Sequence, residues 1–316
     1  MKKFISLLLA LLMCLSMAAC SADEERDDEK DEEKIEKEEK EEKEEPAKES
    51  EEYKAAKALL DEGKVKEAYE ALYAIRDDAN AKALMEKFIV VPTKEEAEGG
   101  SVTKYEYSED GLKEKESIYC NDRLESSRIY SYEEGRCIKE TLSFNGQGTK
   151  QYTYHEYNSD GLLSKSKTEY GGSVSEIEYF YNGDEKCVKQ VSRDSAGNEY
   201  VIEFEYDNNG NPVKEISKQG GVVASTTTYK LDGEGRVIEI TTEYARYGGS
   251  DTIKMTYNTD GIVAVQTFMT GNEKHYDMVF FYNQKHGSLT SIERHYPDGR
   301  KEKVKDYSGF EFYYVG

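Results

Sequence analysis

A tyrosine-centred pattern recurs along most of this chain at a nearly constant interval. From residue 101 onward, Tyr-x-Tyr pairs or close variants return every 24 to 26 residues. The second member of each pair falls at Tyr107, Tyr132, Tyr157, Tyr181, Tyr206, Leu231, Tyr257, Tyr282 and Tyr307. A fixed period over 200 residues indicates a repeat architecture in which each unit is one supersecondary element.

Each unit contains two turn signals separated by about a dozen residues. The first follows the tyrosine pair, as Asn-Ser-Asp-Gly at 158–161 and Asp-Asn-Asn-Gly at 207–210. The second is centred on glycine, as at 171–172 and 220–221. Asn, Asp and Gly supply the positive φ angles and local hydrogen bonds that hairpin turns need. Eight units over residues 101–316 therefore predict a mainly β array of about 16 antiparallel strands, with a terminal remnant.

One face of the predicted sheet is aromatic and the other is polar. Side chains alternate between the faces of a strand, and 13 of the 16 Tyr-x-Tyr positions in the eight units are aromatic. We interpret these positions as a mainly structural stripe: Tyr105, Tyr107, Tyr130, Tyr132, Tyr157, Tyr179, Tyr181, Phe204, Tyr206, Tyr229, Tyr257, Phe280 and Tyr282. A flat sheet would expose the whole stripe, which soluble proteins rarely tolerate. We therefore expect a curled sheet or a shell.

Lysines recur on the polar face, at Lys115, Lys139, Lys165, Lys189 and Lys214. Extending the hairpin register through its turn places Lys214 opposite Glu203 and Lys189 opposite Glu178. Cross-strand ion pairs of this kind contribute about 0.2 to 1 kcal/mol each. We therefore assign these lysines a structural role.

Four tyrosines outside the stripe are candidates for contact with a partner. They are Tyr152, Tyr154, Tyr244 and Tyr247. Rigid amphipathic rings on an exposed surface are enriched in binding interfaces because they cost little entropy to order. The expected partner is a protein or a glycan.

The repeat is similar to the YD repeat of the RHS family. The motif Tyr-Asp-x-x-Gly, followed by an apolar-rich strand, a glycine turn and another Tyr-x-Tyr, is clearest from Tyr206 to Tyr229. The resemblance covers residues 105–307 and implies a β-sheet wound from successive hairpins. RHS proteins can enclose a toxin in such a shell, but only the sheet architecture carries over to this short array. A weaker resemblance is to MORN-like hairpin arrays.

The N-terminal residues have the pattern of a bacterial lipoprotein signal. Two lysines precede an apolar run over residues 4–15, and Met-Ala-Ala at 17–19 leads directly to Cys20. A basic start, a short apolar stretch and small residues before the cleavage point indicate a secretory signal peptide over residues 1–19. A cysteine at this place resembles the lipobox, whose sulfur receives a diacylglyceryl group, and two acyl chains anchor a protein stably. We expect export and attachment to membrane lipid through Cys20.

A charged spacer and a short helical piece follow. Residues 23–52 contain 19 acidic and 7 basic residues, a net charge of −12, in a Glu-Glu-Lys rhythm typical of a solvated helix or coiled coil. Residues 20–52 are therefore expected to be a spacer. Residues 53–91 have apolar side chains at helical spacing around Gly63 and resemble a tetratricopeptide hairpin, which needs a neighbour to pack on. Pro92 and the glycines at 99–100 predict a linker over residues 92–100.

Composition and motif searches exclude several classes of function. The formal net charge of −22 opposes binding to a phosphate backbone, so no nucleic-acid partner is expected. Cys120, Cys137 and Cys187 match neither a disulfide framework nor a zinc spacing, and the four histidines form no His-Glu-x-x-His pair. No P-loop, nucleophile elbow or dinucleotide turn is present in the sequence. We predict no catalytic residue, no metal and no cofactor.

Together, these features favour a lipid-anchored extracytoplasmic protein that presents a tyrosine-rich β-repeat surface to a protein or glycan and acts without catalysis. One alternative is a cell-envelope hydrolase that acts on glycans in an aromatic cleft. A second alternative is a self-assembling structural element of the surface, because an open array leaves strand edges that pair with another chain.

Overall fold

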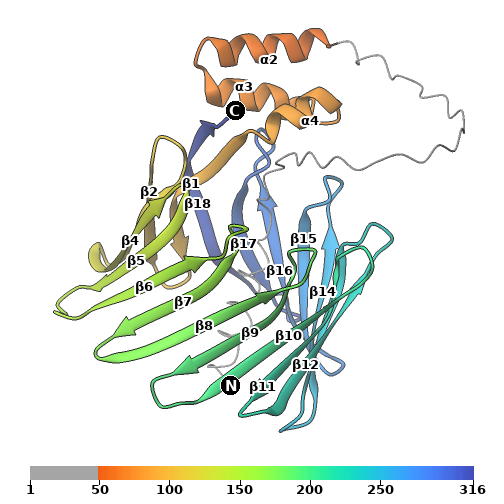
Figure 1. Cartoon of the computed structure of the whole chain (residues 1–316). Helices are drawn as coiled ribbons and strands as arrows, with labels where there is room; N and C mark the ends of the chain where they lie inside the picture. The colour runs from red at the N-terminus through yellow and green to blue at the C-terminus, as the bar shows by residue number, and fades with distance from the viewer. Residues whose placement is uncertain (1–48) are drawn as a thin grey trace, which may run out of the picture. The chain divides into compact units, whose positions relative to one another are not determined.

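The computed structural model describes residues 49–316, which form three short helices and a single large β-sheet (Figure 1). Consecutive strands are antiparallel neighbours throughout the sheet, and the last strand pairs with the first. The sheet therefore has no free edge and closes into an 18-stranded barrel. This corrects the expectation of a curled sheet of about 16 strands.

The eight predicted hairpin units supply sixteen of the strands, from β2 to β17. The strands are β1 (Phe88–Ala97), β2 (Ser101–Tyr107), β3 (Lys113–Cys120), β4 (Arg123–Glu133), β5 (Arg136–Phe144), β6 (Lys150–Tyr157), β7 (Leu163–Tyr170), β8 (Ser173–Tyr181), β9 (Cys187–Asp194), β10 (Glu199–Tyr206), β11 (Pro212–Gln219), β12 (Val222–Leu231), β13 (Val237–Tyr244), β14 (Ser250–Tyr257), β15 (Val263–Thr270), β16 (Glu273–Tyr282), β17 (Leu289–His295) and β18 (Lys301–Tyr314). The period of the sequence is thus the period of the hairpins.

Two strands outside the eight units close the barrel. The strand β1 precedes the repeat, and it pairs with β18 from Phe88 opposite Tyr314 to Ala97 opposite Lys305. Its opening residues are apolar and include three β-branched side chains at 89–91, which favour a strand. Residues 92–97, predicted as part of a linker, are therefore the second half of this closing strand.

Next to the turn after each Tyr-x-Tyr pair, the second strand of the hairpin contains an extra residue that shifts the register. In the hairpin of β10 and β11, Asp207 Oδ1 accepts from the N–H groups of Asn209 and Asn211, and the strand pairing shifts between Glu205 and Tyr206. The bulge places Lys214 opposite Glu205. The predicted pairing of Lys214 with Glu203 is therefore wrong by two residues, although the two residues do lie on the same face.

The offset is the same in the preceding unit. Lys189 lies opposite Phe180, where the prediction placed Glu178. Its Nζ lies 5.7 Å from the centre of the Phe180 ring, so a cation–π contact takes the place of the expected ion pair.

Exposure shows which face of the barrel wall is the inner one. In β2, β6 and β10 the residue between the two aromatic positions is exposed, as for Glu106, Glu156 and Glu205, while the second tyrosine of each pair is half-buried. Side chains diverge on the convex side of a closed sheet and converge on its concave side, so the less exposed set faces inward. The aromatic stripe therefore lines the inside of the barrel, and the residues that alternate with it, such as Glu106, Glu156 and Glu205, lie on the outside.

Three helices lie at one end of the barrel (Figure 1): α2 (Glu51–Asp61), α3 (Val65–Ala74) and α4 (Ala79–Met85). Ser50 and Asp78 cap α2 and α4 with their side-chain oxygens. Their buried core consists of Tyr53, Ala56, Leu72 and Ala81. Within residues 49–316, no helix has both the length and the apolar character that crossing a membrane requires.

Aromatic rings and one ion pair join the helices to the barrel. The Tyr69 ring lies 5.3 Å from that of Phe88 and 5.8 Å from that of Phe312, measured between centroids. Arg76 in the α3–α4 connection pairs with Asp260 in the turn after β14 at 3.0 Å. The helical piece is thus packed against the rim, which is the environment that a single helical hairpin needs.

Candidate functional site: the lining of the barrel

The second tyrosine of most units ties that unit to the previous one. Its hydroxyl donates to the backbone carbonyl oxygen of a residue in the preceding strand over 2.6 to 2.9 Å, and this residue is the first or second of its strand except for Pro92, which lies in the middle of β1. The pairs are Tyr107 with Pro92, Tyr132 with Lys113, Tyr157 with Cys137, Tyr181 with Leu163, Tyr206 with Cys187, Tyr257 with Val237 and Tyr282 with Val263. Burial raises the pKa of these hydroxyls, that of Tyr132 to about 12, so they remain donors at neutral pH.

The first aromatic position of each unit faces a second inward side chain across its hairpin. We call these eight cross-strand pairs the lining pairs. They are Tyr105–Glu116, Tyr130–Glu140, His155–Ser166, Tyr179–Gln190, Phe204–Glu215, Tyr229–Ile240, Met255–Gln266 and Phe280–Ile292. The partner is polar in the first five units and isoleucine in two of the last three. One wall of the lumen is therefore polar and the opposite wall is more apolar.

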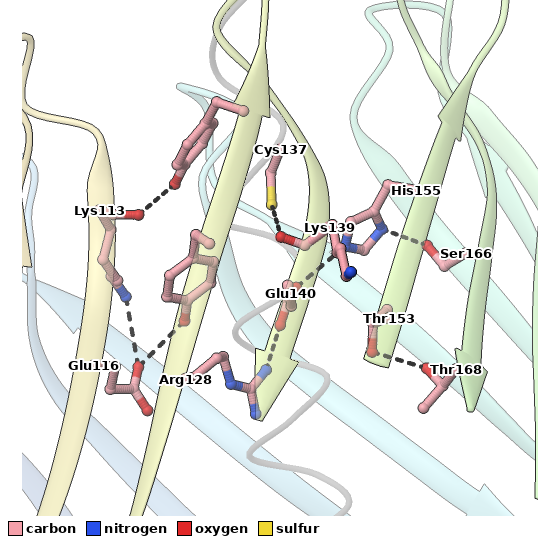
Figure 2. A network of polar contacts seen from close by, with 12 residues as sticks. Lys113, Glu116, Arg128, Cys137, Lys139, Glu140, Thr153, His155, Ser166 and Thr168 are labelled. Atoms are coloured by element: carbon pink, nitrogen blue, oxygen red, sulfur yellow. Dashed lines mark hydrogen bonds and ion pairs between the residues drawn. The ribbon is translucent and has the colours of Figure 1, made fainter. Parts of the chain in front are cut away.

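A network of polar side chains occupies the wall formed by β3 to β7 (Figure 2). We call it the polar cluster, and its centre is Glu140, which accepts from Arg128 Nη1 at 2.5 Å through Oε2. The other oxygen, Oε1, lies 3.2 Å from His155 Nε2, and His155 Nδ1 lies 2.9 Å from Ser166 Oγ. On the far side of Arg128, the Tyr130 hydroxyl donates to Glu116. The polar cluster thus consists of two sets of contacts, Tyr130 with Glu116 and Arg128 through Glu140 and His155 to Ser166, which together cover five strands.

The surroundings of Glu140 favour its ionised form. The hydrogen bond with His155 and the pairing with Arg128 hold the pKa of this carboxyl below its usual range, against the opposing effect of burial. Burial and the nearby Glu140 charge raise the pKa of the Cys137 thiol. Cys137 is therefore a thiol in the unliganded chain, and its Sγ donates weakly to the Lys139 carbonyl oxygen at 3.7 Å. It has neither the low pKa nor a hydrogen bond to His155 that a catalytic thiolate requires.

Sequence reasoning missed one feature of this cluster. Ligand-type atoms of Cys137, Glu140 and His155 all lie within 4.8 Å of one another. Cys137 and Glu140 are three residues apart on β5, and His155 takes the first aromatic position of the next unit. Aligning the units would have identified them as neighbours, because that position of one unit lies beside the second strand of the unit before it.

The four tyrosines proposed as contact residues do not form one surface. Tyr152 and Tyr154 lie on the outer face of β6, with ring centroids 6.4 Å apart and Lys139 Nζ close to both rings. Tyr247 is 72% exposed in the turn after β13, whereas Tyr244 is half-buried and donates to Asp251. Tyr152 and Tyr154 therefore lie together, whereas Tyr247 is exposed by itself and Tyr244 is engaged with Asp251. Cys20, the predicted lipid attachment site, lies outside the described residues.

The three described cysteines are free thiols, all half-buried. Cys137 and Cys187 lie at the start of the second strand of their units, as the second and the first strand residue, where other units have Leu163, Pro212 or Val237. The backbone carbonyl of this residue accepts the tyrosine hydroxyl whatever the side chain.

Comparisons with known proteins show only weak structural similarity. No protein-family model matches the chain, and no curated protein is similar to it in sequence. A porin-like protein from Bacteroides uniformis has a TM-score of 0.40 and 12% identity, over 72% of this chain and 96% of that one. A porin-like protein from Bacteroides vulgatus has a TM-score of 0.37 and 15% identity, over 69% and 97%. The TcdB2-TccC3-Cdc42 structure has a TM-score of 0.27 and 12% identity, over 67% of this chain but 17% of that one. These similarities assign the chain to no family.

Proposed function

We propose that this protein is a lipid-anchored, extracytoplasmic binding protein that holds a glycan inside its barrel and acts without catalysis. The observation that carries the proposal is the set of lining pairs, in which a ring and, in most units, a polar group lie side by side on the inner wall. Aromatic rings stack on the C–H faces of sugars, and carboxylates and amides accept or donate hydrogen bonds to hydroxyls.

The barrel is wide enough to admit a ligand. Eighteen strands about 4.8 Å apart and tilted by about 40° give a backbone-to-backbone diameter of roughly 35 Å. Side chains fill barrels of about 8 strands, whereas those of 16 to 18 strands leave internal space. Several inward side chains, such as Glu116 and Arg128, retain accessible surface in agreement with this.

The proposed binding surface is the inner wall of the barrel. The register aromatics, expected to be mainly structural, face the lumen beside the polar members of the lining pairs. Self-assembly through free strand edges also loses its basis, because β1 and β18 pair and leave no edge.

The charged side chains on the outer face favour a barrel whose outer surface is exposed to water. Lys115 pairs with Glu106 at 2.7 Å, Lys214 with Glu205 at 3.0 Å and Lys165 with Glu176 at 3.0 Å. A barrel embedded in lipid needs an outward apolar band, and charges on that face destabilise it. We infer that the barrel lies outside the bilayer, held there by lipid on Cys20 and the charged spacer.

Binding to a glycan array tests this function. The full chain in detergent is screened against envelope glycans, and the best ligand is titrated by calorimetry. Phe204→Ala, which removes a ring from the lumen, is expected to weaken binding at least tenfold. Phe180→Ala removes a ring that is 45% exposed on the outside of the neighbouring unit and is the matched control. Absence of binding to any glycan, or equal losses in the two variants, would overturn the proposal.

A further inference from the structure

We propose that Cys137, Glu140 and His155 form a zinc(II) site on the inner wall of β5 and β6. This inference is independent of the glycan, because it rests only on the side chains of the polar cluster. Their ligand atoms, Sγ, a carboxylate oxygen and a ring nitrogen, all lie within 4.8 Å of one another. A tetrahedral zinc ion with bonds of about 2.0 to 2.3 Å places its ligand atoms roughly 3.3 to 3.8 Å apart. Small side-chain rotations close this difference.

The groups that orient two of the ligands are already in place. His155 Nδ1 lies 2.9 Å from the oxygen of buried Ser166, and Nε2 faces Glu140 Oε1. When zinc displaces the proton on Nε2, Nδ1–H donates to Ser166 and the Nε2 lone pair binds the metal. Arg128 holds the Oε2 atom of Glu140, which leaves Oε1, the oxygen nearest Nε2, for the metal. Zinc ligands typically have such partners, which fix the tautomer and the direction of the lone pair.

The ligand types favour zinc over calcium and magnesium. A thiolate and an imidazole bind zinc well, whereas calcium and magnesium take oxygen ligands almost exclusively. Three protein ligands leave a fourth position, as in open zinc sites. The side chains of His155 and Glu140 remain 14% and 20% exposed, so the fourth position is open to water or to an oxygen of a bound molecule.

The repeat provides an internal comparison two units further on. Cys187 occupies the place of Cys137: Tyr206 donates to its carbonyl as Tyr157 does to that of Cys137, both at 2.8 Å. Its Sγ donates to the Lys189 carbonyl oxygen at 3.6 Å, as Cys137 does to Lys139. The places of the other two ligands, however, are taken by Gln190 and Phe204, which are not zinc ligands. The repeat alone therefore accounts for a cysteine at this position but not for the ligand set.

Metal titration of the full chain in detergent tests the site. After removal of metal with a chelator, zinc is added in competition with a chromophoric chelator, and cobalt(II) is added to a second sample. The wild type is expected to bind one zinc per chain tightly and to show the near-ultraviolet charge-transfer band of a cobalt–thiolate bond. Cys137→Ser and His155→Gln are expected to weaken zinc binding at least tenfold, and Cys137→Ser also loses the band.

Cys187→Ser is the matched control and is expected to leave stoichiometry, affinity and spectrum unchanged. Circular dichroism checks the fold of each variant, and if Cys137→Ser does not fold, His155→Gln and the wild-type spectrum decide. Zinc on the acidic spacer would give no thiolate band. A wild type without the band, or an equal loss in Cys187→Ser, would overturn the proposal.

Discussion

The hydroxyl of Tyr206 on β10 donates a 2.8 Å hydrogen bond to the backbone carbonyl oxygen of Cys187, the first residue of β9. Because Cys187 is the first residue after the turn between β8 and β9, this bond attaches that turn end of one unit to the first strand of the next unit. Six other tyrosines repeat the arrangement around the barrel. The periodic tyrosine thus joins neighbouring units by a hydrogen bond and also supplies an apolar ring to the inner wall.

Replacing Tyr206 with Phe is expected to lower the free energy of unfolding by about 1 kcal/mol. The ring stays, but the donor is lost and the half-buried carbonyl oxygen of Cys187 loses its partner. Urea unfolding followed by circular dichroism measures the change. Tyr247→Phe, in an exposed turn, is the control and is expected to change stability by less than about 0.5 kcal/mol. Equal effects in the two variants would show that the repeated bond adds nothing to stability.

The closing strands offer a second test. Gly309 in β18 has a φ of +66°, and a Cβ built on it would overlap Thr93 Oγ1 in β1. Gly146 has a similar φ of +74° with nothing nearby. Both substitutions to alanine incur the cost of positive φ, about 1 kcal/mol, but Gly309→Ala must also displace Thr93. We expect a clearly lower thermal midpoint for Gly309→Ala than for Gly146→Ala.

The added cost at Gly309 has a specific rescue. Thr93→Ala removes the overlapping oxygen. In the Thr93→Ala background, Gly309→Ala is therefore expected to lower the thermal midpoint only by about as much as Gly146→Ala lowers it in the wild type. Thermal unfolding of the four variants gives this comparison. If Thr93→Ala restores nothing, the clash at the seam between β1 and β18 is not the source of the loss.

The number of repeated strands could be predicted, because turn residues and alternating faces are local signals. Closure could not be predicted in the same way. The strand β1 has no Tyr-x-Tyr pair, and its partner β18 is more than 200 residues away, so only the three-dimensional curvature of the sheet brings Val90 opposite Phe312. Edge pairing between distant segments leaves no periodic trace in a single sequence.

The polar cluster was missed for a related reason. Each residue there has an ordinary place in the repeat, and Cys137 and His155 are 18 residues apart in the sequence without a known motif spacing. Their contact depends on the register between β5 and β6, where Glu140 lies opposite Thr153, and the bulge inside each hairpin changes which side chains of β5 and β6 face inward. A cluster of functional side chains, in which each member replaces the usual residue at one repeat position, can be recognised only once the pairing of the strands is known.

His286 predicts a dependence of stability on pH. It is 6% exposed between the rings of Phe310 and Phe312, and its Nδ1 has no hydrogen-bond partner among residues 49–316. Burial lowers its pKa, so the unfolded chain binds a proton more readily than the folded chain. Its contribution is therefore fully favourable above the ordinary value of 6.5, and stability falls as the pH drops through that value.

Thermal unfolding between pH 7.5 and 5.0 measures this effect. His286→Gln is expected to show a smaller decline toward low pH than the wild type, whatever its stability at pH 7.5. His275→Gln removes an exposed histidine and is expected to leave the decline unchanged. An unaltered slope in His286→Gln would assign the decline to other groups.

Glu215 predicts the opposite sign. It is 5% exposed, opposite Phe204 on the inner wall, and its hydrogen bond from Tyr229 at 3.3 Å only partly offsets burial. Burial raises its pKa above the ordinary 4.5, so the folded chain binds the proton more tightly than the unfolded chain. The ionised carboxylate therefore destabilises the fold at neutral pH, and this penalty disappears as the pH falls below 4.5.

Glu215→Gln keeps an oxygen for the Tyr229 hydroxyl and removes the buried charge, so it is expected to raise the free energy of unfolding at pH 7 by on the order of 1 kcal/mol. Because protonation removes the same charge from the wild type, the two proteins should converge near pH 4. Glu205→Gln in the same hairpin breaks an outer ion pair with Lys214 and should instead lower stability at pH 7 by about 0 to 1 kcal/mol. Urea unfolding at both pH values measures all three proteins, and a Glu215→Gln variant less stable than wild type at pH 7 would mean that the carboxylate is well solvated within the lumen.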